Sequence, residues 1–187
     1  KESVDLIRKA KKEGLPVTCE TAPHYISLFR NEENMYNTFF KVNPPLKEEE
    51  DVAKIIEGLK DGTIDIIATD HAPHTLKEKK ASYTLAPNGI CGFETSVAVA
   101  LTYLRDYLSL KEICDKFSKN PRKILNLGNF GKIEKGNIAN FVILDINNEW
   151  TVRGKEFKSK CKITPFENTK LKGKVFATIV NGVYYEH

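Results

Sequence analysis

Apolar residues in the first part of the chain alternate between helical spacing and short continuous runs. Residues 1–14 and residues 47–62 each place apolar side chains at helical spacing, and the two segments end at Gly14 and Gly62. A glycine directly after the last apolar turn is typical of a helix end, because it tolerates the left-handed backbone found there. We therefore predict a helix in each segment.

Runs that favour β-structure lie between these helices. Residues 15–22 and 63–69 are short, apolar and bounded by turn residues, and each follows a predicted helix. A largely apolar helix is expected over 93–108, with shorter helical pieces over 110–117 and 121–127. Alternation of helix and strand predicts an α/β fold in which βα units form a parallel sheet.

The pattern changes after residue 128. Residues 137–152 and 173–187 are β-rich, and a loop-like segment separates them. The Asn181-Gly182 dipeptide is typical of a tight β-hairpin turn. A small β-rich appendage is the natural interpretation. We therefore divide the chain into two parts, residues 1–130 and residues 131–187.

Composition narrows the class of protein. Lysine and arginine total 29 against 25 aspartate and glutamate, and the lysines are scattered. Because a nucleic-acid surface needs clustered basic residues with stacking aromatics, we expect no nucleic-acid partner. No apolar run approaches the roughly 18 residues of a membrane span, so we expect a soluble, cytoplasmic protein. The 4 cysteines lie far apart without a C-x-x-C pair, which favours free thiols.

The run GTIDIIATDHAPH begins as a buried strand and ends in an acid and two histidines. Asp70 falls at the carboxyl end of that strand, where the catalytic groups of parallel α/β folds gather. Asp70 with His71 and His74 suits a divalent metal ion, since carboxylate oxygen and imidazole nitrogen are both zinc ligands. The alternative is that Asp70 caps a turn and the histidines are surface or supporting groups.

A second candidate precedes two prolines. In FFKVNPPL, the Pro-Pro pair removes two backbone donors and holds Asn43 extended. Asn43 could present its amide to a carboxylate or carbonyl of a substrate, or it could simply close a turn. The residues alone leave both readings open.

The chain resembles the second half of the bacterial type I dihydroorotases, in the amidohydrolase superfamily. Five segments keep the order and spacing of that family: VTCETAPHY, KVNPPL, GTIDIIATDHAPH, APNGICGFET and, more weakly, SKCKITPF. The resemblance implies a zinc-dependent cyclic amidase that interconverts N-carbamoyl-L-aspartate and L-dihydroorotate in pyrimidine biosynthesis. It also implies a (β/α)₈ TIM-type barrel, whose last two strands would be PVTCET and IDIIAT, with a small β domain built from both chain ends.

The resemblance assigns roles to individual residues. Asp70 matches the aspartate that ligates one metal ion and shuttles the proton for a hydroxide held between two zinc ions. Asn43 and His74 match side chains that hold the substrate, and Asn88 with Gly89 matches a backbone contact loop. The family's remaining metal ligands would lie upstream of Lys1, so we expect a fragment that is inactive alone and is completed by a missing N-terminal half.

Two other histidines receive supporting roles. His24 is expected to make a structural hydrogen bond inside the protein, and His71 is expected to orient or shield the turn at Asp70. The sequence departs from the family where it has Tyr25 in place of a second histidine and Asn88 in place of an aromatic residue. A contact through the Asn88 backbone would survive this change of side chain, whereas a packing contact of the side chain with the substrate would not.

Two alternatives stay open beside dihydroorotase. A sister cyclic amidase of the allantoinase or dihydropyrimidinase type would share the fold and Asp70, but need not arrange Asn43 and His74 for the same substrate. A non-catalytic dihydroorotase-like partner of aspartate transcarbamoylase would lack metal ligands upstream. A homodimer is a further partner arrangement that the resemblance allows.

Overall fold

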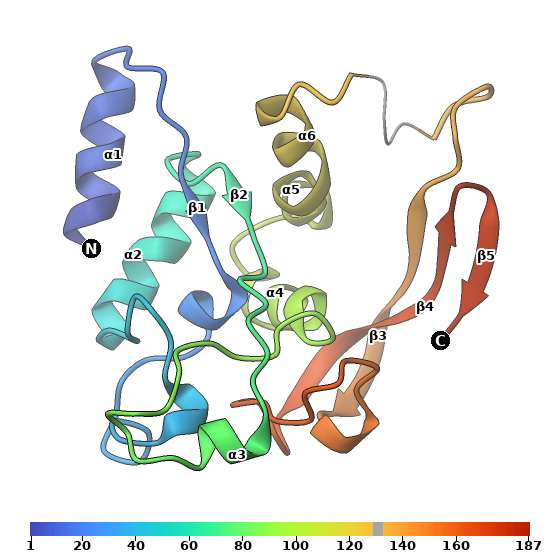
Figure 1. Cartoon of the computed structure of the whole chain (residues 1–187). Helices are drawn as coiled ribbons and strands as arrows, with labels where there is room; N and C mark the ends of the chain where they lie inside the picture. The colour runs from blue at the N-terminus through green and yellow to red at the C-terminus, as the bar shows by residue number, and fades with distance from the viewer. Residues whose placement is uncertain (129–132) are drawn as a thin grey trace.

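The computed structural model describes residues 1–128 and 133–187 (Figure 1). Its first part is a mixture of helices and short strands, and its last part is an antiparallel sheet. The α-helices are α1 (Glu2–Lys12), α2 (Glu49–Lys60), α3 (Leu76–Lys79), α4 (Ser96–Leu104), α5 (Leu110–Cys114) and α6 (Asn120–Ile124). The shorter turns are η1 (Pro23–Ile26), η2 (Thr38–Phe40), η4 (Gly154–Glu156) and the π-helical η3 (Asp115–Lys119).

The two predicted strands pair in parallel, as expected. Strand β1 (Glu20–Thr21) pairs with β2 (Ile66–Ile67), with Glu20 opposite Ile66. The backbone N–H of Ala68 extends the pairing by donating to the Thr21 carbonyl at 2.9 Å. Both strands are shorter than the predicted runs, because β-prone residues form a strand only where a neighbouring segment continues the hydrogen-bond ladder.

The predicted helices form, with adjusted ends. Helix α1 is followed by Gly14 at φ 79°, and α2 by Gly62 at φ 81°, as their glycine signals indicated. Helix α4 is shorter than the expected 93–108, and most of its residues are buried. Ser109 and Glu112 form a capping box that starts α5 as a separate helix, which is why the apolar pattern does not run on as one element.

Three antiparallel strands make up the last part of the chain: β3 (Phe141–Thr151), β4 (Lys170–Val180) and β5 (Val183–Glu186). The predicted turn is confirmed, with Asn181 at φ 51° and Gly182 at φ 82°. Two successive positive φ angles are typical of a type I′ hairpin, whose twist matches the flanking strands. The expected boundary between residues 130 and 131 lies outside the described residues.

Helix α4 connects the two parts of the chain. One cluster of buried apolar side chains includes Leu101 and Leu104 of α4, Ile64 before β2, and Leu171 of β4. The backbone N–H of Lys172 donates to the Thr102 hydroxyl at 2.8 Å, so β4 is bonded to α4 as well as packed on it. No helix within the described ranges is long and apolar enough to cross a membrane.

The contact of β4 with α4 leads to a stability prediction. A Cβ on Gly173 would lie 2.3 Å from Leu101 Cδ1, whereas one on Gly182 would meet nothing within 4 Å. Both glycines have positive φ, so Gly173→Ala and Gly182→Ala share the cost of the left-handed backbone. We expect Gly173→Ala to lose about 1–3 kcal/mol more unfolding free energy than Gly182→Ala, through overpacking. Urea denaturation checks this, and equal losses would contradict it.

Candidate active site

Asp70 lies where β2 ends, with a backbone that few aspartates adopt. Its φ is 48°, in the left-handed region. Its side chain is 50% exposed, and the carboxylate accepts no hydrogen bond within residues 1–128 and 133–187. Non-glycine residues hold such a conformation mainly where the surroundings or a function require it. The result is an oxygen donor at the strand end with its lone pairs free.

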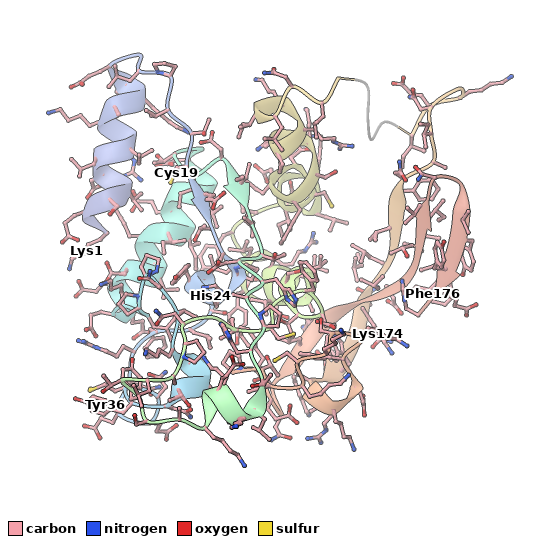
Figure 2. All side chains as sticks on the ribbon, in the orientation of Figure 1. Lys1, Cys19, His24, Tyr36, Lys174 and Phe176 are labelled. Atoms are coloured by element: carbon pink, nitrogen blue, oxygen red, sulfur yellow. The ribbon has the colours of Figure 1, made fainter. Side chains whose placement is uncertain are left out.

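His24 lies beside Asp70, at the end of the neighbouring strand. It belongs to η1, which follows β1, and Figure 2 shows it near the middle of the molecule. Its Nε2 is 3.8 Å from Asp70 Oδ2. Burial lowers the pKa of His24 to about 4, so the ring is neutral near pH 7.

The expected internal hydrogen bond of His24 is not found at Nε2. This buried nitrogen has no partner among the described residues, and 3.8 Å to the carboxylate is beyond hydrogen-bond range. The prediction was wrong for this nitrogen, because η1 buries the ring with Nε2 beyond hydrogen-bond range of the Asp70 carboxylate. An unpaired buried nitrogen beside an open carboxylate marks this edge as a place for a polar ligand.

His71 anchors the turn that carries Asp70. Its Nδ1 accepts hydrogen bonds from the backbone N–H groups of Gly92 and Phe93, at 3.1 and 3.3 Å. The imidazole also stacks on the Phe93 ring, with centroids 3.8 Å apart and planes 5° apart. Because Nδ1 is used as an acceptor, the network assigns the proton of the neutral ring to Nε2. These contacts agree with the supporting role expected for His71.

Three of the predicted substrate residues meet on one side of this edge. His74 Nε2 lies 2.9 Å from the backbone oxygen of Asn88. Gly89 has φ 127°, and a Cβ there would lie 2.6 Å from the Ala72 oxygen and 3.1 Å from His74 Nε2. Only glycine allows so close an approach. The turn after β2 and the loop at Asn88 therefore form one unit.

Asn43 is carried on a neighbouring loop. Its side chain is exposed, and the Lys41 carbonyl two residues earlier accepts a hydrogen bond from the Gly89 N–H at 2.9 Å. On the other side, the Tyr25 hydroxyl donates to the Pro44 oxygen at 2.6 Å. The loop that carries Asn43 is thus fixed between the segment after β1 and the segment at Gly89.

Two residues in this region were not singled out from the sequence. Tyr25 is half-buried, and burial together with the nearby Asp70 charge raises its pKa to about 12, so it stays a hydroxyl donor. Lys79 is 2% exposed and its ammonium is surrounded by backbone oxygens. The only sequence signal for Tyr25 was its place in the PHY segment. For Lys79 there was none, since a lysine at the end of a polar helix normally faces solvent.

Asp70 is suited to be one ligand of a metal site at this edge. Within residues 1–128 and 133–187, no three histidine, cysteine, aspartate or glutamate side chains lie close enough together to hold an ion. The metal cluster of Asp70 with both nearby histidines, which their spacing suggested, is not formed among the described residues, and His71 and His74 make backbone contacts instead. Asp70, half-exposed and without a hydrogen bond in the described part of the chain, has the oxygen donors that a divalent cation prefers.

Two dihydroorotases are similar in sequence to this chain. A dihydroorotase of Acetivibrio thermocellus is 50% identical over 182 residues, which are 96% of this chain and 42% of that protein. A dihydroorotase of Ruminiclostridium cellulolyticum is 51% identical over 181 residues, with 96% and 42% covered. These relatives confirm the resemblance seen in the five sequence segments. The chain spans about two fifths of the length of the curated relatives it matches.

Solved structures share the fold. An L-hydantoinase (dihydropyrimidinase) from Arthrobacter aurescens has a TM-score of 0.92 at 29% identity, covering 100% of this chain and 43% of that one. A dihydropyrimidinase from Brevibacillus agri NCHU1002 has a TM-score of 0.88 at 23% identity, over 97% and 41%. The model of the amidohydrolase family matches residues 1–184. Since that match takes in nearly every residue, the chain belongs to the amidohydrolase family.

Proposed function

We propose that this chain is part of a dihydroorotase, which interconverts N-carbamoyl-L-aspartate and L-dihydroorotate. The observation that carries the proposal is the meeting of His74, Asn88 and Gly89 in the segments that follow Asp70, with the Lys41 carbonyl of the Asn43 loop bonded to the Gly89 N–H. Relatives named dihydroorotase are about half identical to the chain over this region. The substrate, the activity and the site residues are inferences from this combination.

The fold of the complete protein is inferred in the same way. We assign β1 and β2, with the helices that follow them, to the last two units of a (β/α)₈ barrel. The parallel pairing of β1 with β2 and the likeness to the hydantoinase fold support this. Residues 1–130 would then belong to the barrel and residues 131–187 to a small β domain, both completed by sequence that the chain does not contain.

Asp70 is the residue to which we assign the proton transfer. Zinc ions, when bound, would activate the attacking water and polarise the ring carbonyl, and most of their ligands would come from outside this chain. Asp70 would ligate through one carboxylate oxygen and accept the proton of the water with the other. It would return that proton to the ring nitrogen as the C–N bond breaks. Its exposed, unbonded carboxylate fits this double use.

The other residues suit an anionic substrate. Asn43 supplies amide donors without a charge of its own, and His74 supplies an imidazole already held by the Asn88 oxygen. The backbone N–H of Asn88 makes no hydrogen bond within the described ranges, so it is available to a substrate oxygen. Donors such as amide and imidazole N–H groups bind carboxylate and carbonyl oxygens without displacing a metal ligand.

One observation favours a second candidate. The L-hydantoinase from Arthrobacter aurescens has nearly the same fold over the whole chain. A cyclic amidase of the hydantoinase, dihydropyrimidinase or allantoinase type would also use Asp70, but would not need Asn43 and His74 for a substrate carboxylate. A non-catalytic partner of aspartate transcarbamoylase is the remaining reading, and it requires that no metal be bound.

A substrate comparison separates these candidates. With the complete protein supplied with zinc, we expect turnover of dihydroorotate to exceed that of hydantoin and allantoin by at least about tenfold in kcat/KM, because only dihydroorotate offers a carboxylate to the donors at this edge. The assay follows ring opening by absorbance in the ultraviolet. Preference for hydantoin or allantoin would assign the sister activity, and absence of both turnover and bound zinc would favour the non-catalytic partner.

Replacement of Asp70 tests the proton transfer. Asp70→Asn removes the base but keeps the size of the side chain, so we expect kcat to fall by about 10²–10⁴-fold with the fold retained. Asp106→Asn changes an exposed aspartate outside the site and serves as the control. Steady-state kinetics with zinc content and circular dichroism make the comparison. Near-normal kcat in a zinc-loaded Asp70→Asn protein would refute the assignment.

Gly89 tests the backbone loop. In Gly89→Ala the new Cβ would lie 2.6 Å from Ala72, so the Asn88 loop must move away from His74. Gly62→Ala also places a side chain at a positive φ, 81°, but with no neighbour within 4 Å, and is the control. We expect KM for dihydroorotate to rise about tenfold or more in Gly89→Ala only, the loss of roughly one well-placed hydrogen bond to a charged group. Equal KM values in the two variants would remove this loop from substrate binding.

A further inference from the structure

Lys79 is a charged residue in an uncharged interior. It ends α3, five positions after His74, and only 2% of its surface is exposed, whereas Lys77 and Lys80 on either side are exposed. Burial of an ammonium group costs free energy unless its donors are satisfied. The contacts that satisfy this one therefore explain why it is buried.

Backbone carbonyls satisfy the three donors of the ammonium. Lys79 Nζ donates to the oxygens of Gly89 at 2.9 Å, Pro87 at 3.1 Å and Lys41 at 3.4 Å. A lysine has three N–H donors and no acceptor, so each donor can serve one of these oxygens. The three oxygens belong to two loops that are far apart in sequence. A single side chain thus joins the segment before Asn43 to the segment around Asn88.

These hydrogen bonds fix the orientation of the backbone around Asn88. The carbonyls on either side of Asn88, those of Pro87 and Gly89, turn toward Lys79 Nζ. The carbonyl of Asn88 itself turns toward His74 Nε2, at 2.9 Å. Successive peptide groups are therefore held from opposite sides. The orientation of the Asn88 peptide depends on both contacts.

Hydrogen bonds to carbonyl oxygens, and no ion pair within the described residues, hold the Lys79 ammonium in place. Burial, together with the nearby positive charge of Lys41, lowers the pKa of Lys79 to about 8. No carboxylate within the described residues pairs with it. Lys41 directs its own ammonium to the oxygens of Ala86 and Tyr83, at 2.6 and 2.7 Å, on the same loop. Two lysines thus bind the carbonyls of residues 83–89.

We propose that Lys79 is a positioning residue for substrate binding: its buried ammonium holds residues 41–43 and 87–89 so that Asn43 and the Asn88 peptide face the substrate. The inference rests on the proposed function for the identity of that substrate. The joining of the two loops does not depend on the substrate. An apolar residue at position 79 would leave the carbonyls of Pro87 and Gly89 without donors and the Lys41 carbonyl with only the Gly89 N–H, so the contact between the two loops would loosen.

The test compares Lys79→Met with Lys80→Met in the complete, zinc-loaded protein. Methionine keeps the length and apolar stem of lysine without the ammonium, and Lys80 is the exposed neighbour. Hydrogen exchange by mass spectrometry follows residues 41–43 and 87–89, and kinetics with dihydroorotate gives KM and kcat. We expect Lys79→Met to speed exchange in these segments and to raise KM about tenfold or more, with kcat changed by less than about threefold. Lys80→Met should match the wild type in both measurements.

Each other outcome overturns the proposal. Exchange and KM in Lys79→Met that equal those of Lys80→Met would show that the ammonium holds nothing. Faster exchange across α1, α2 and the strands, with KM unchanged, would show a general role in stability. If Lys79→Met does not fold, Lys79→Gln replaces it, because the amide keeps two donors on a shorter chain. The glutamine variant should raise KM while retaining kcat, and a wild-type KM would refute the proposal.

The two proposals fail separately. If the wild-type protein does not turn over dihydroorotate but Lys79→Met still speeds exchange at residues 41–43 and 87–89, the dihydroorotase assignment falls and the link between loops stands. If dihydroorotate is turned over and exchange is unchanged, the assignment stands and the role of Lys79 falls. Exchange therefore reports on the loops, and kinetics reports on their use.

Discussion

Parallel strands end at the same edge of a sheet, and in this chain that constraint brings His24 and Asp70 together. The ladder between β1 and β2 is short, with only Glu20 and Thr21 paired to Ile66 and Ile67. It nevertheless brings the segments that follow both strands together, so that His24 Nε2 and Asp70 Oδ2 lie 3.8 Å apart. Without this pairing, the two groups would belong to loops more than forty residues apart in sequence with no reason to meet.

Beyond the strand ends, polar contacts hold the site more than apolar packing does. The main core contains most buried side chains of α4 and its neighbours, but the loops at Asn43 and Asn88 cover only a small second cluster of Val42, Leu46 and Ile90. Hydrogen bonds from Lys79, Lys41 and the Gly89 backbone supply the remaining connections. Such bonds have fixed geometry, which suits loops that must present donors at definite positions.

Much of the fold can be predicted from the sequence, because these elements depend on local patterns of residues. Helices α1 and α2 follow from apolar spacing and their terminal glycines, and the hairpin turn follows from Asn181 and Gly182. Asp70 was found because it directly follows an apolar strand. Strand lengths were not predictable, since a β-prone run becomes a strand only as far as its neighbour extends.

The site was harder to predict because its parts depend on contacts between distant segments. The sequence could not indicate that His74 would turn toward the Asn88 oxygen, or that Lys79 would leave the solvent for three carbonyls. His24 illustrates the same limit, since a buried histidine was expected to find an internal partner and its Nε2 has none in the described part of the chain. The family resemblance named several of these residues, but only the packing of the loops explains how they come together.

We infer that the edge formed by β1 and β2, with the loops beside it, presents one metal ligand and a set of donors to a carboxylate substrate. The most direct measurement is a crystal structure of the complete protein with zinc and dihydroorotate, with the metal located by anomalous scattering. We expect zinc bound to a carboxylate oxygen of Asp70 and the substrate carboxylate in contact with Asn43 or His74. Zinc bound away from Asp70, or a substrate that contacts neither Asn43 nor His74, would contradict the account.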